Sequence, residues 1–193
     1  MILRQTTMSA CLAVAVSLAC ATLAQAQAGA ESFTATATVK TAGGAEATAP
    51  ITITIDRMMP EAEADKLVAA FKSGGPAGLR EALAGVPPTG SVQLADGAPT
   101  PARITIERAT DNGRLIIIIT DKPLLFLGAG VPGAKPKDGY DFAVVDLEVD
   151  ASGVGSGTLA PAAKITVKGT AFVVEDYASE LVRLAGVKKV KQK

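Results

Sequence analysis

Residues 104–120 read ITIERATDNGRLIIIIT, and this stretch decides the expected fold. Ile104 and Ile106 alternate with polar residues, which is the period-two pattern of a half-buried strand. Asp111-Asn112-Gly113 is a strong hairpin signal, because Asn and Gly tolerate a positive φ. The return strand, residues 115–119, is an unbroken run of large aliphatic side chains. Neither face of such a strand is exposed without a large loss of hydrophobic free energy, so we expect it to be covered on both sides, by a second sheet or by helices.

Strand patterns flank this hairpin on both sides along the chain. Residues 32–40 alternate apolar and polar side chains, and residues 51–55 continue the pattern after a glycine-containing loop. We expect these two segments to be neighbouring antiparallel strands. Further strands are expected from the pattern at about 142–149, 162–167 and 171–175, with a closing strand over 181–190.

Between these strands, the period of the apolar residues changes to that of a helix. Ala64, Leu67, Val68 and Phe71 follow the i, i+3, i+4, i+7 spacing of an amphipathic helix. Gly74-Gly75 ends this helix, and the same spacing resumes after Pro76 until Pro87-Pro88. Proline is favoured at the first position of a helix, so the pattern predicts two short helices over about 60–86.

The fold class expected from these patterns is mainly β. We predict a β-sandwich or flattened barrel of about eight antiparallel strands, with the two-helix insertion at about 60–86 packed over one open side. Residues 27–193 are expected to form a single β-rich domain, because 167 residues remain of the 193 once the first 26 are removed, enough for one ordinary core.

The first 26 residues have the three parts of a secretory signal peptide. Arg4 gives a positive start, residues 11–23 are apolar and uncharged, and Ala24-Gln25-Ala26 is a small-x-small cleavage site. Cleavage after Ala28 fits equally well. We therefore expect a periplasmic or secreted protein, without distinguishing between these two locations.

Two alternatives exist for this N-terminal segment. A retained membrane anchor needs about 20 apolar residues, more than residues 11–23 provide. Lipidation at Cys20 is the other, but Ser17 stands where a bacterial lipobox has a large aliphatic residue. Signal-peptide cleavage is therefore the preferred interpretation, and no transmembrane segment is expected after it.

The composition of the cleaved chain excludes several kinds of chemistry. Loss of Arg4 would leave 18 basic residues against 19 acidic ones, so the net charge is close to zero. The chain therefore has no overall positive potential that would attract nucleic acid. Both cysteines lie in the first 26 residues, and the chain has no histidine. Ser-His-Asp and Cys-His catalysis, ordinary zinc sites and a disulfide framework are therefore excluded, and we expect no metal and no cofactor.

Carboxylates are the remaining candidates for catalysis or ion binding. Asp121, Asp138 and Asp141 are candidates for the carboxylate pair of a glycosidase-like hydrolase. Asp146 and Glu148 share one face of a predicted strand with Asp150. Such a trio could hold a hard cation, although a solvated strand face is the simpler interpretation, with Lys164 or Lys168 as partners across a hairpin.

Glycines cluster in the segment 150–157, which contains Gly153-Val154-Gly155-Ser156-Gly157. This composition resembles a phosphate-binding loop, but no helix follows it. We predict a hairpin turn here. The basic residues 188–193 are likewise interpreted as a solvated tail, with contact to an anionic surface as the alternative.

The longest irregular segment, residues 122–140, is the predicted ligand site. It directly follows the most apolar strand and is rich in proline and glycine. Long loops of this kind are either functional or simply mobile, and composition does not separate the two. Lys122, Phe126 and Tyr140 are the candidate ligand-binding residues. The alternative is structural, namely a strand that bends at Pro123 and buries Leu125 or Phe126.

Several segments together resemble a group of small exported bacterial proteins with no assigned activity. They are residues 120–126 (TDKPLLF), 140–142 (YDF), 146–150 (DLEVD) ahead of the glycine turn, and 163–165 (AKI). This resemblance extends over most of the mature chain. It implies export and one compact β-rich domain, and it assigns no functional residue.

The sequence therefore favours an exported, non-catalytic envelope or secreted module. It would bind a small apolar ligand or a partner protein of the cell envelope through the 122–140 loop. The alternative is a carboxylate-dependent hydrolase that uses Asp121 and Asp141.

Overall fold

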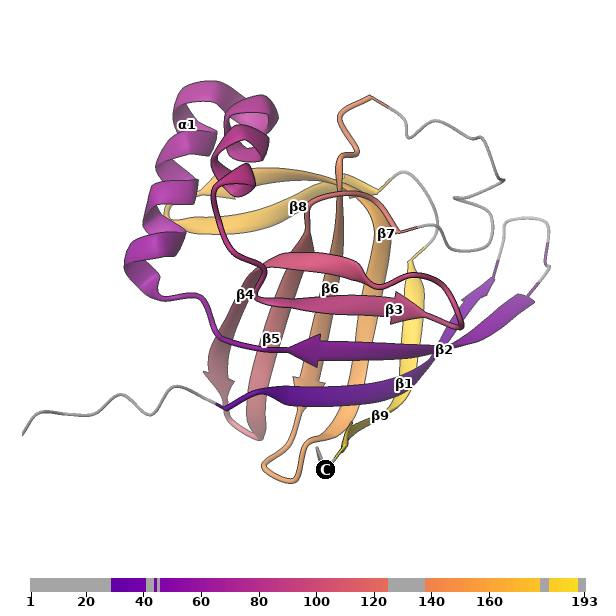
Figure 1. The fold of residues 1–193 in the computed structure, drawn as a ribbon. Helices are drawn as coiled ribbons and strands as arrows, with labels where there is room; N and C mark the ends of the chain where they lie inside the picture. The colour runs from indigo at the N-terminus through magenta and orange to yellow at the C-terminus, as the bar shows by residue number, and fades with distance from the viewer. Residues whose placement is uncertain (1–28, 41–43, 45, 125–137, 178–180, 191–193) are drawn as a thin grey trace, which may run out of the picture.

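A computed structural model describes residues 29–40, 44, 46–124, 138–177 and 181–190 (Figure 1). It contains nine strands and one helical element in this part of the chain. Their bounds are β1 Glu31–Lys40, β2 Glu46–Ile55, α1 Glu61–Ala84, β3 Gly90–Leu94, β4 Thr100–Thr110, β5 Gly113–Thr120, β6 Phe142–Val149, β7 Val154–Lys168, β8 Ala171–Tyr177 and β9 Val182–Val190. The mainly β class that the sequence predicts is confirmed.

Eight of these strands form a closed antiparallel barrel. The strand order is β6-β5-β4-β3-β2-β1-β9-β7-β8, and an additional pairing between β6 and β7 closes the ring. Of the strands in the described ranges, only β8 lies outside the ring, paired to the C-terminal half of β7. Closure gives every barrel strand two neighbours, which removes exposed edges that would pair with other chains. Of the two predicted architectures, sandwich and flattened barrel, the structure has a barrel, with one additional strand outside it.

The hairpin that decides the fold forms as predicted. Thr110 pairs with Gly113 around the Asp111-Asn112 turn, and Ile106 pairs with Ile117. The segments 32–40 and 51–55 are confirmed as antiparallel neighbours, and they belong to the longer strands β1 and β2. The predicted closing strand is β9, which pairs with both β1 and β7.

The barrel interior holds one of the two apolar cores. All eight barrel strands contribute to it, with Phe33, Ile51, Val92, Ala102, Ile116, Val145, Leu159 and Val182 among its buried side chains. Because side chains alternate along a strand, Ile116 and Ile118 belong to this interior core, whereas Ile119 belongs to a second core outside the barrel wall. The predicted cover on both sides is complete at Ile119, whereas Leu115 and Ile117 on the outer face are only half-buried.

The helical insertion forms one element with an internal break. Gly75 has φ 60° and ψ −152° within α1, so Pro76 starts a second helical segment where the sequence places it. A glycine suits this break because other residues are strained at such a φ. Leu67, Leu79 and Leu83 pack with Ile119 in the second core. No helix in the described ranges is long and apolar enough to cross a membrane.

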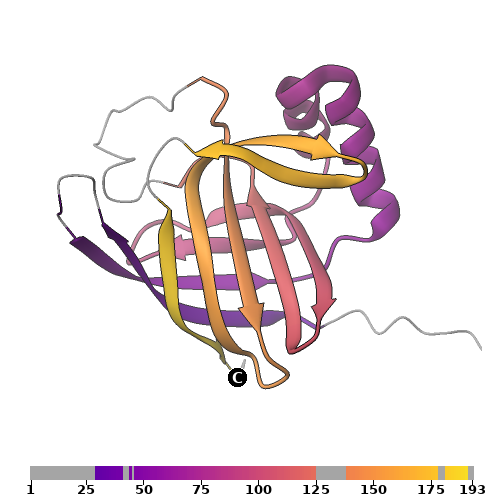
Figure 2. The same ribbon diagram turned by 180° about the vertical axis from the view of Figure 1, so that it is seen from behind.

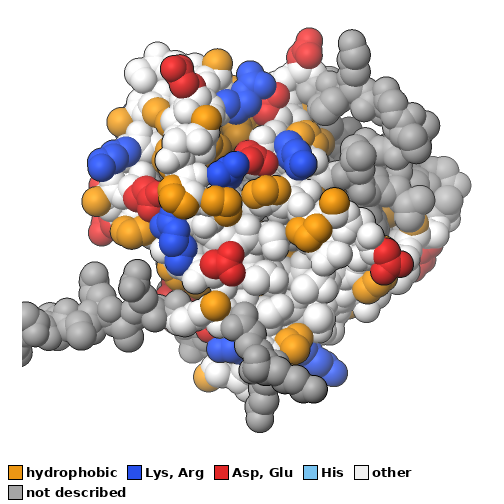
Figure 3. Space-filling view, viewed as in Figure 1, with side chains coloured by type: hydrophobic (Ala, Val, Ile, Leu, Met, Phe, Trp, Pro, Cys, Tyr) orange, Lys and Arg blue, Asp and Glu red, His pale blue; other side chains and the backbone are white. Residues whose placement is uncertain are grey.

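Two arginines fix the ends of α1. Arg57 Nη1 contacts Glu63 Oε2 in the first turn at 2.8 Å. Arg103 on β4 donates from Nη1 to the carbonyl oxygen of Val86, just beyond the helix, at 2.8 Å. Charged side chains of both signs gather over α1 and its border with the sheet (Figure 3). The insertion is therefore joined to the barrel by polar contacts as well as by its apolar face.

Two details of the sequence prediction are wrong. The sequence does not predict β3, because its five residues are too few for a clear alternation. The glycine-rich segment 150–157 is not one long turn, since β7 begins at Val154 and both Gly155 and Gly157 pair with β6. A Cβ at Gly155 would lie 1.9 Å from the carbonyl oxygen of Glu148, so glycine serves close strand approach here and not turn formation.

Candidate functional site

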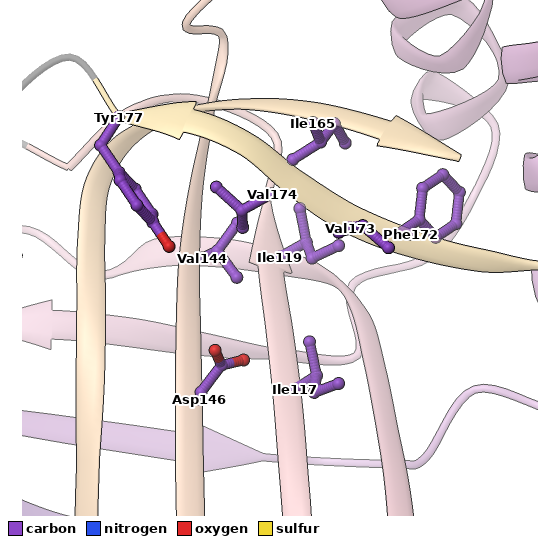
Figure 4. A pocket seen from close by; sticks show the side chains of 9 residues that line it. All are labelled: Ile117, Ile119, Val144, Asp146, Ile165, Phe172, Val173, Val174 and Tyr177. Atoms are coloured by element: carbon purple, nitrogen blue, oxygen red, sulfur yellow. The ribbon is translucent and has the colours of Figure 1, made fainter. Parts of the chain in front are cut away.

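A groove lies on the outer wall of the barrel, beneath β8 (Figure 4). Its volume is about 270 Å³. The residues that line it are Ile117 and Ile119 from β5, Val144 and Asp146 from β6, Ile165 from β7, and Phe172, Val173, Val174 and Tyr177 from β8. We call this the β8 groove. Seven of these nine side chains are aliphatic or phenyl groups, so the groove is suited to an apolar ligand.

β8 covers the groove because β7 changes direction at Pro161. The β6–β7 register shifts between Phe142 and Val144 at this point, and the amide of Leu124 donates to the Pro161 carbonyl oxygen at 2.8 Å. Beyond it, β7 pairs with β8, and the two strands pass across the outside of the barrel (Figure 2). Proline lacks an N–H, so it is compatible with the point where a strand leaves one partner for another.

Contacts at both ends hold β8 over the groove. Phe172 at one end meets Phe71 of α1 edge-to-face, with ring centroids 6.3 Å apart. At the other end the Tyr140 hydroxyl donates to the Asp176 carboxylate, next to Tyr177. The edge-to-face pair adds about 0.5–1.5 kcal/mol beyond area burial. These contacts fix the position of β8, and the groove beneath it is therefore formed by the fold itself.

Asp146 is the acidic residue of the groove. It lies on the outer face of β6, opposite Ile117 on one side and Thr158 on the other. Figure 4 shows its carboxyl group turned toward the space beneath β8, among aliphatic side chains. Within the described residues the carboxyl group of Asp146 has neither a hydrogen bond nor an ion pair, and burial raises its pKa above the ordinary 3.8.

Asp146→Asn should therefore stabilise the protein slightly at neutral pH. Because the folded-state pKa is raised, the ionised carboxylate disfavours the native state above that pKa, and this penalty disappears as the pH falls below the ordinary value. We expect a gain of less than about 1 kcal/mol, since partial exposure screens the charge. Urea unfolding at neutral and acidic pH measures it. A loss of stability at neutral pH would contradict this account of Asp146.

The other two acids of the predicted trio are solvated. Glu148 and Asp150 are exposed, as a solvated strand face requires. Hydrogen bonds from the Ser152 hydroxyl and the Val154 amide lower the pKa of Asp150, which organises the β6–β7 turn. Lys164 pairs with Glu175 of β8 at 3.3 Å and not with the trio. Of the three acids, Asp146 is the one that is partly buried.

A second, larger cleft lies on the opposite side of β7. Its volume is about 870 Å³, and Lys40, Ser156, Thr158 and Arg183 are among its lining residues. Lys40 already contacts Glu46 at 3.4 Å, and both side chains are largely exposed. Three of its nine lining side chains, Leu181, Leu184 and Ala185, are aliphatic, against seven apolar side chains of nine in the β8 groove. The β8 groove is therefore the stronger candidate for an apolar ligand.

The predicted site residues have different surroundings. Lys122 is exposed, whereas Tyr140 is only 6% exposed and bonds to Asp176. Phe126 lies outside the described residues. The predicted ligand site at Lys122, Phe126 and Tyr140 therefore stays a prediction, and Tyr140 contributes to the β8 groove through its contact with β8.

The carboxylates considered for catalysis have arginine partners. Asp121 Oδ2 lies 2.8 Å from Arg103 Nε, and Asp141 Oδ1 lies 3.3 Å from Arg80 Nη1. Asp138 is exposed. Among the residues with described positions, no group of three or more acidic, histidine or cysteine side chains could hold a metal ion.

The β8 groove is not predicted from the sequence, because Ile117, Ile119 and Val144 have the pattern of core residues. One signal for it is present in the sequence, because Asp146 interrupts the apolar alternation that begins with Phe142 and Val144.

No protein-family model, curated protein or solved structure matches this chain.

Proposed function

We propose that this chain is an exported, non-catalytic binding module that holds a small apolar ligand in the β8 groove. The observation that carries the proposal is the groove itself, a concave and mostly apolar space on the outer wall of a closed barrel. The export part depends on the charged, apolar and small-residue pattern of residues 1–26.

Binding is favoured over catalysis by the side chains available. The β8 groove offers one carboxylate and one tyrosine hydroxyl, together with aliphatic and phenyl groups. Hydrolysis of a glycoside usually requires two carboxylates on either side of the scissile bond. Asp121 and Asp141 are each engaged by a different arginine, and neither lines the groove. A ligand would therefore be held without being transformed.

Phe172→Ala should weaken binding of a neutral apolar probe such as 2-phenylethanol at least about fivefold. The phenyl ring lines the groove, and loss of part of its buried area costs about 1 kcal/mol or more. NMR titration of the labelled protein provides both the affinity and the location, because shifts of the probe-bound state should concentrate on β5, β6 and β8.

Val154→Ala is the matched control. Val154 is 46% exposed at the start of β7 and does not line the groove, so its truncation should leave the affinity unchanged. Shift changes centred elsewhere on the barrel, or equal weakening by both variants, would rule out the β8 groove as the site.

A further inference from the structure

We infer that the ligand of the β8 groove carries a protonated amine, which pairs with the carboxylate of Asp146. This inference depends on the proposed function and specifies the chemical class of its ligand. The expected ligand is a small alkyl- or arylalkyl-ammonium compound with an apolar body.

The first support is the position of the carboxylate. Asp146 lines the groove beside Ile117 and Val144, so a ligand that fills the groove would displace the water that solvates it. A carboxylate covered in this way has a large desolvation cost unless a cation pairs with it. A neutral ligand would leave that cost uncompensated, and an anionic ligand would add repulsion.

The second support is that the protein supplies no cation to Asp146 within the described ranges. Lys164, on the strand that extends over the groove, is paired with Glu175. Asp146 of β6 pairs with Thr158 of β7, which in turn pairs with Arg183 of β9. The backbone of Arg183 therefore lies two strand spacings, or about 9–10 Å, from that of Asp146. No described side chain forms an ion pair with the Asp146 carboxylate, so a cation from the ligand would be its first charged partner.

The third support is the arrangement of apolar and aromatic groups around the acid. Phe172 and Val174 of β8 cover the apolar part of the groove, and the Tyr177 ring extends from the end of β8 toward the same space (Figure 4). An ammonium group beside an aromatic face gains a cation–π attraction in addition to the carboxylate contact. The apolar body and the charged head of an arylalkylamine would therefore each have a matching surface.

The test compares three probes of nearly equal size: 2-phenylethylamine, 2-phenylethanol and phenylacetate. At neutral pH the amine is a cation, the alcohol is neutral and phenylacetate is an anion. We expect the amine to bind at least about tenfold more tightly than the alcohol, because a hydrogen bond between charged groups is stronger than a neutral one. Phenylacetate should bind more weakly than the alcohol. Calorimetric or NMR titration of the full chain measures all three.

Asp146→Asn should remove the preference for the amine and leave the affinity for the alcohol within about threefold of wild type. The matched control is Glu148→Gln, which neutralises the next acid on the same strand face, exposed and outside the groove lining. It should retain the tenfold preference. Circular dichroism confirms that each variant is folded, and Asp146→Ala serves as a second variant.

The outcomes separate this inference from the proposed function. If the alcohol binds in the groove as tightly as the amine, and Asp146→Asn changes neither, the ammonium inference is wrong while the proposed function stands. If Glu148→Gln removes the preference as strongly as Asp146→Asn, a general surface field explains it and the inference is also wrong. If no probe produces saturable shifts at the groove, the proposed function fails first.

Discussion

Gly155→Ala should destabilise the barrel by more than about 3 kcal/mol, beyond the 1–3 kcal/mol typical of an overpacked core. A Cβ at this position would lie 1.9 Å from the Glu148 carbonyl oxygen and 2.9 Å from the Val149 Cα. Both are backbone atoms of β6, so no side-chain rotation relieves the clash. Gly155 also pairs with Val187 of β9, and the new methyl group would force β7 away from one neighbour or the other.

Urea or guanidinium unfolding, followed by circular dichroism, measures the effect. Gly74→Ala is the matched control, because nothing lies within 4 Å of a Cβ there and the residue is within α1. This control should be neutral or stabilising by up to about 1 kcal/mol. If Gly155→Ala unfolds within about 1 kcal/mol of wild type, the close approach of β6 and β7 is not as the structure has it.

The positions of the strands are more predictable from the sequence than the pairing between them. Alternation in residues 32–40 and the run at 115–119 indicate which side chains face a core, and the 111–113 turn joins one pair of strands. Closure of the barrel depends on pairings between distant segments, such as β1 with β9, which no local pattern encodes. For the same reason the sequence places Gly155 in a turn, whereas the close approach of β6 explains why a glycine is required there.

The candidate site was less predictable than the fold. An aspartate that alternates with apolar residues has the same pattern whether its strand face is solvated or covered. Asp146 is partly covered because β7 leaves the barrel near Pro161 and carries β8 across β5 and β6. This path depends on a register shift and on contacts with Phe71 and Tyr140, which are far away in sequence. Burial of the acid is therefore a tertiary property.

At the end of the barrel where β1 starts, one carboxylate joins several strands. Glu31 is 8% exposed and accepts hydrogen bonds from Arg114 of β5 and, at 2.8 Å, from Lys189 of β9. Arg114 also contacts Glu107 of β4 at 2.9 Å. Burial by itself would raise the pKa of Glu31, but the hydrogen bonds from Lys189 and Arg114 outweigh it and leave the pKa below its ordinary value of 4.5.

Glu31→Gln should lower the free energy of unfolding by about 2–3 kcal/mol at neutral pH, since two charge-assisted hydrogen bonds weaken and two cations lose their buried partner. Because the folded-state pKa is lowered, this stabilisation is fully present above 4.5 and is lost as the pH falls through the folded-state value. The difference between wild type and variant should therefore shrink on acidification, as measured by urea unfolding from about pH 7 to pH 3. Glu46→Gln breaks the exposed pair with Lys40 and should cost less than about 0.5 kcal/mol at either pH. A Glu31→Gln deficit that stays constant with pH would show that packing, and not charge, accounts for the contribution of Glu31.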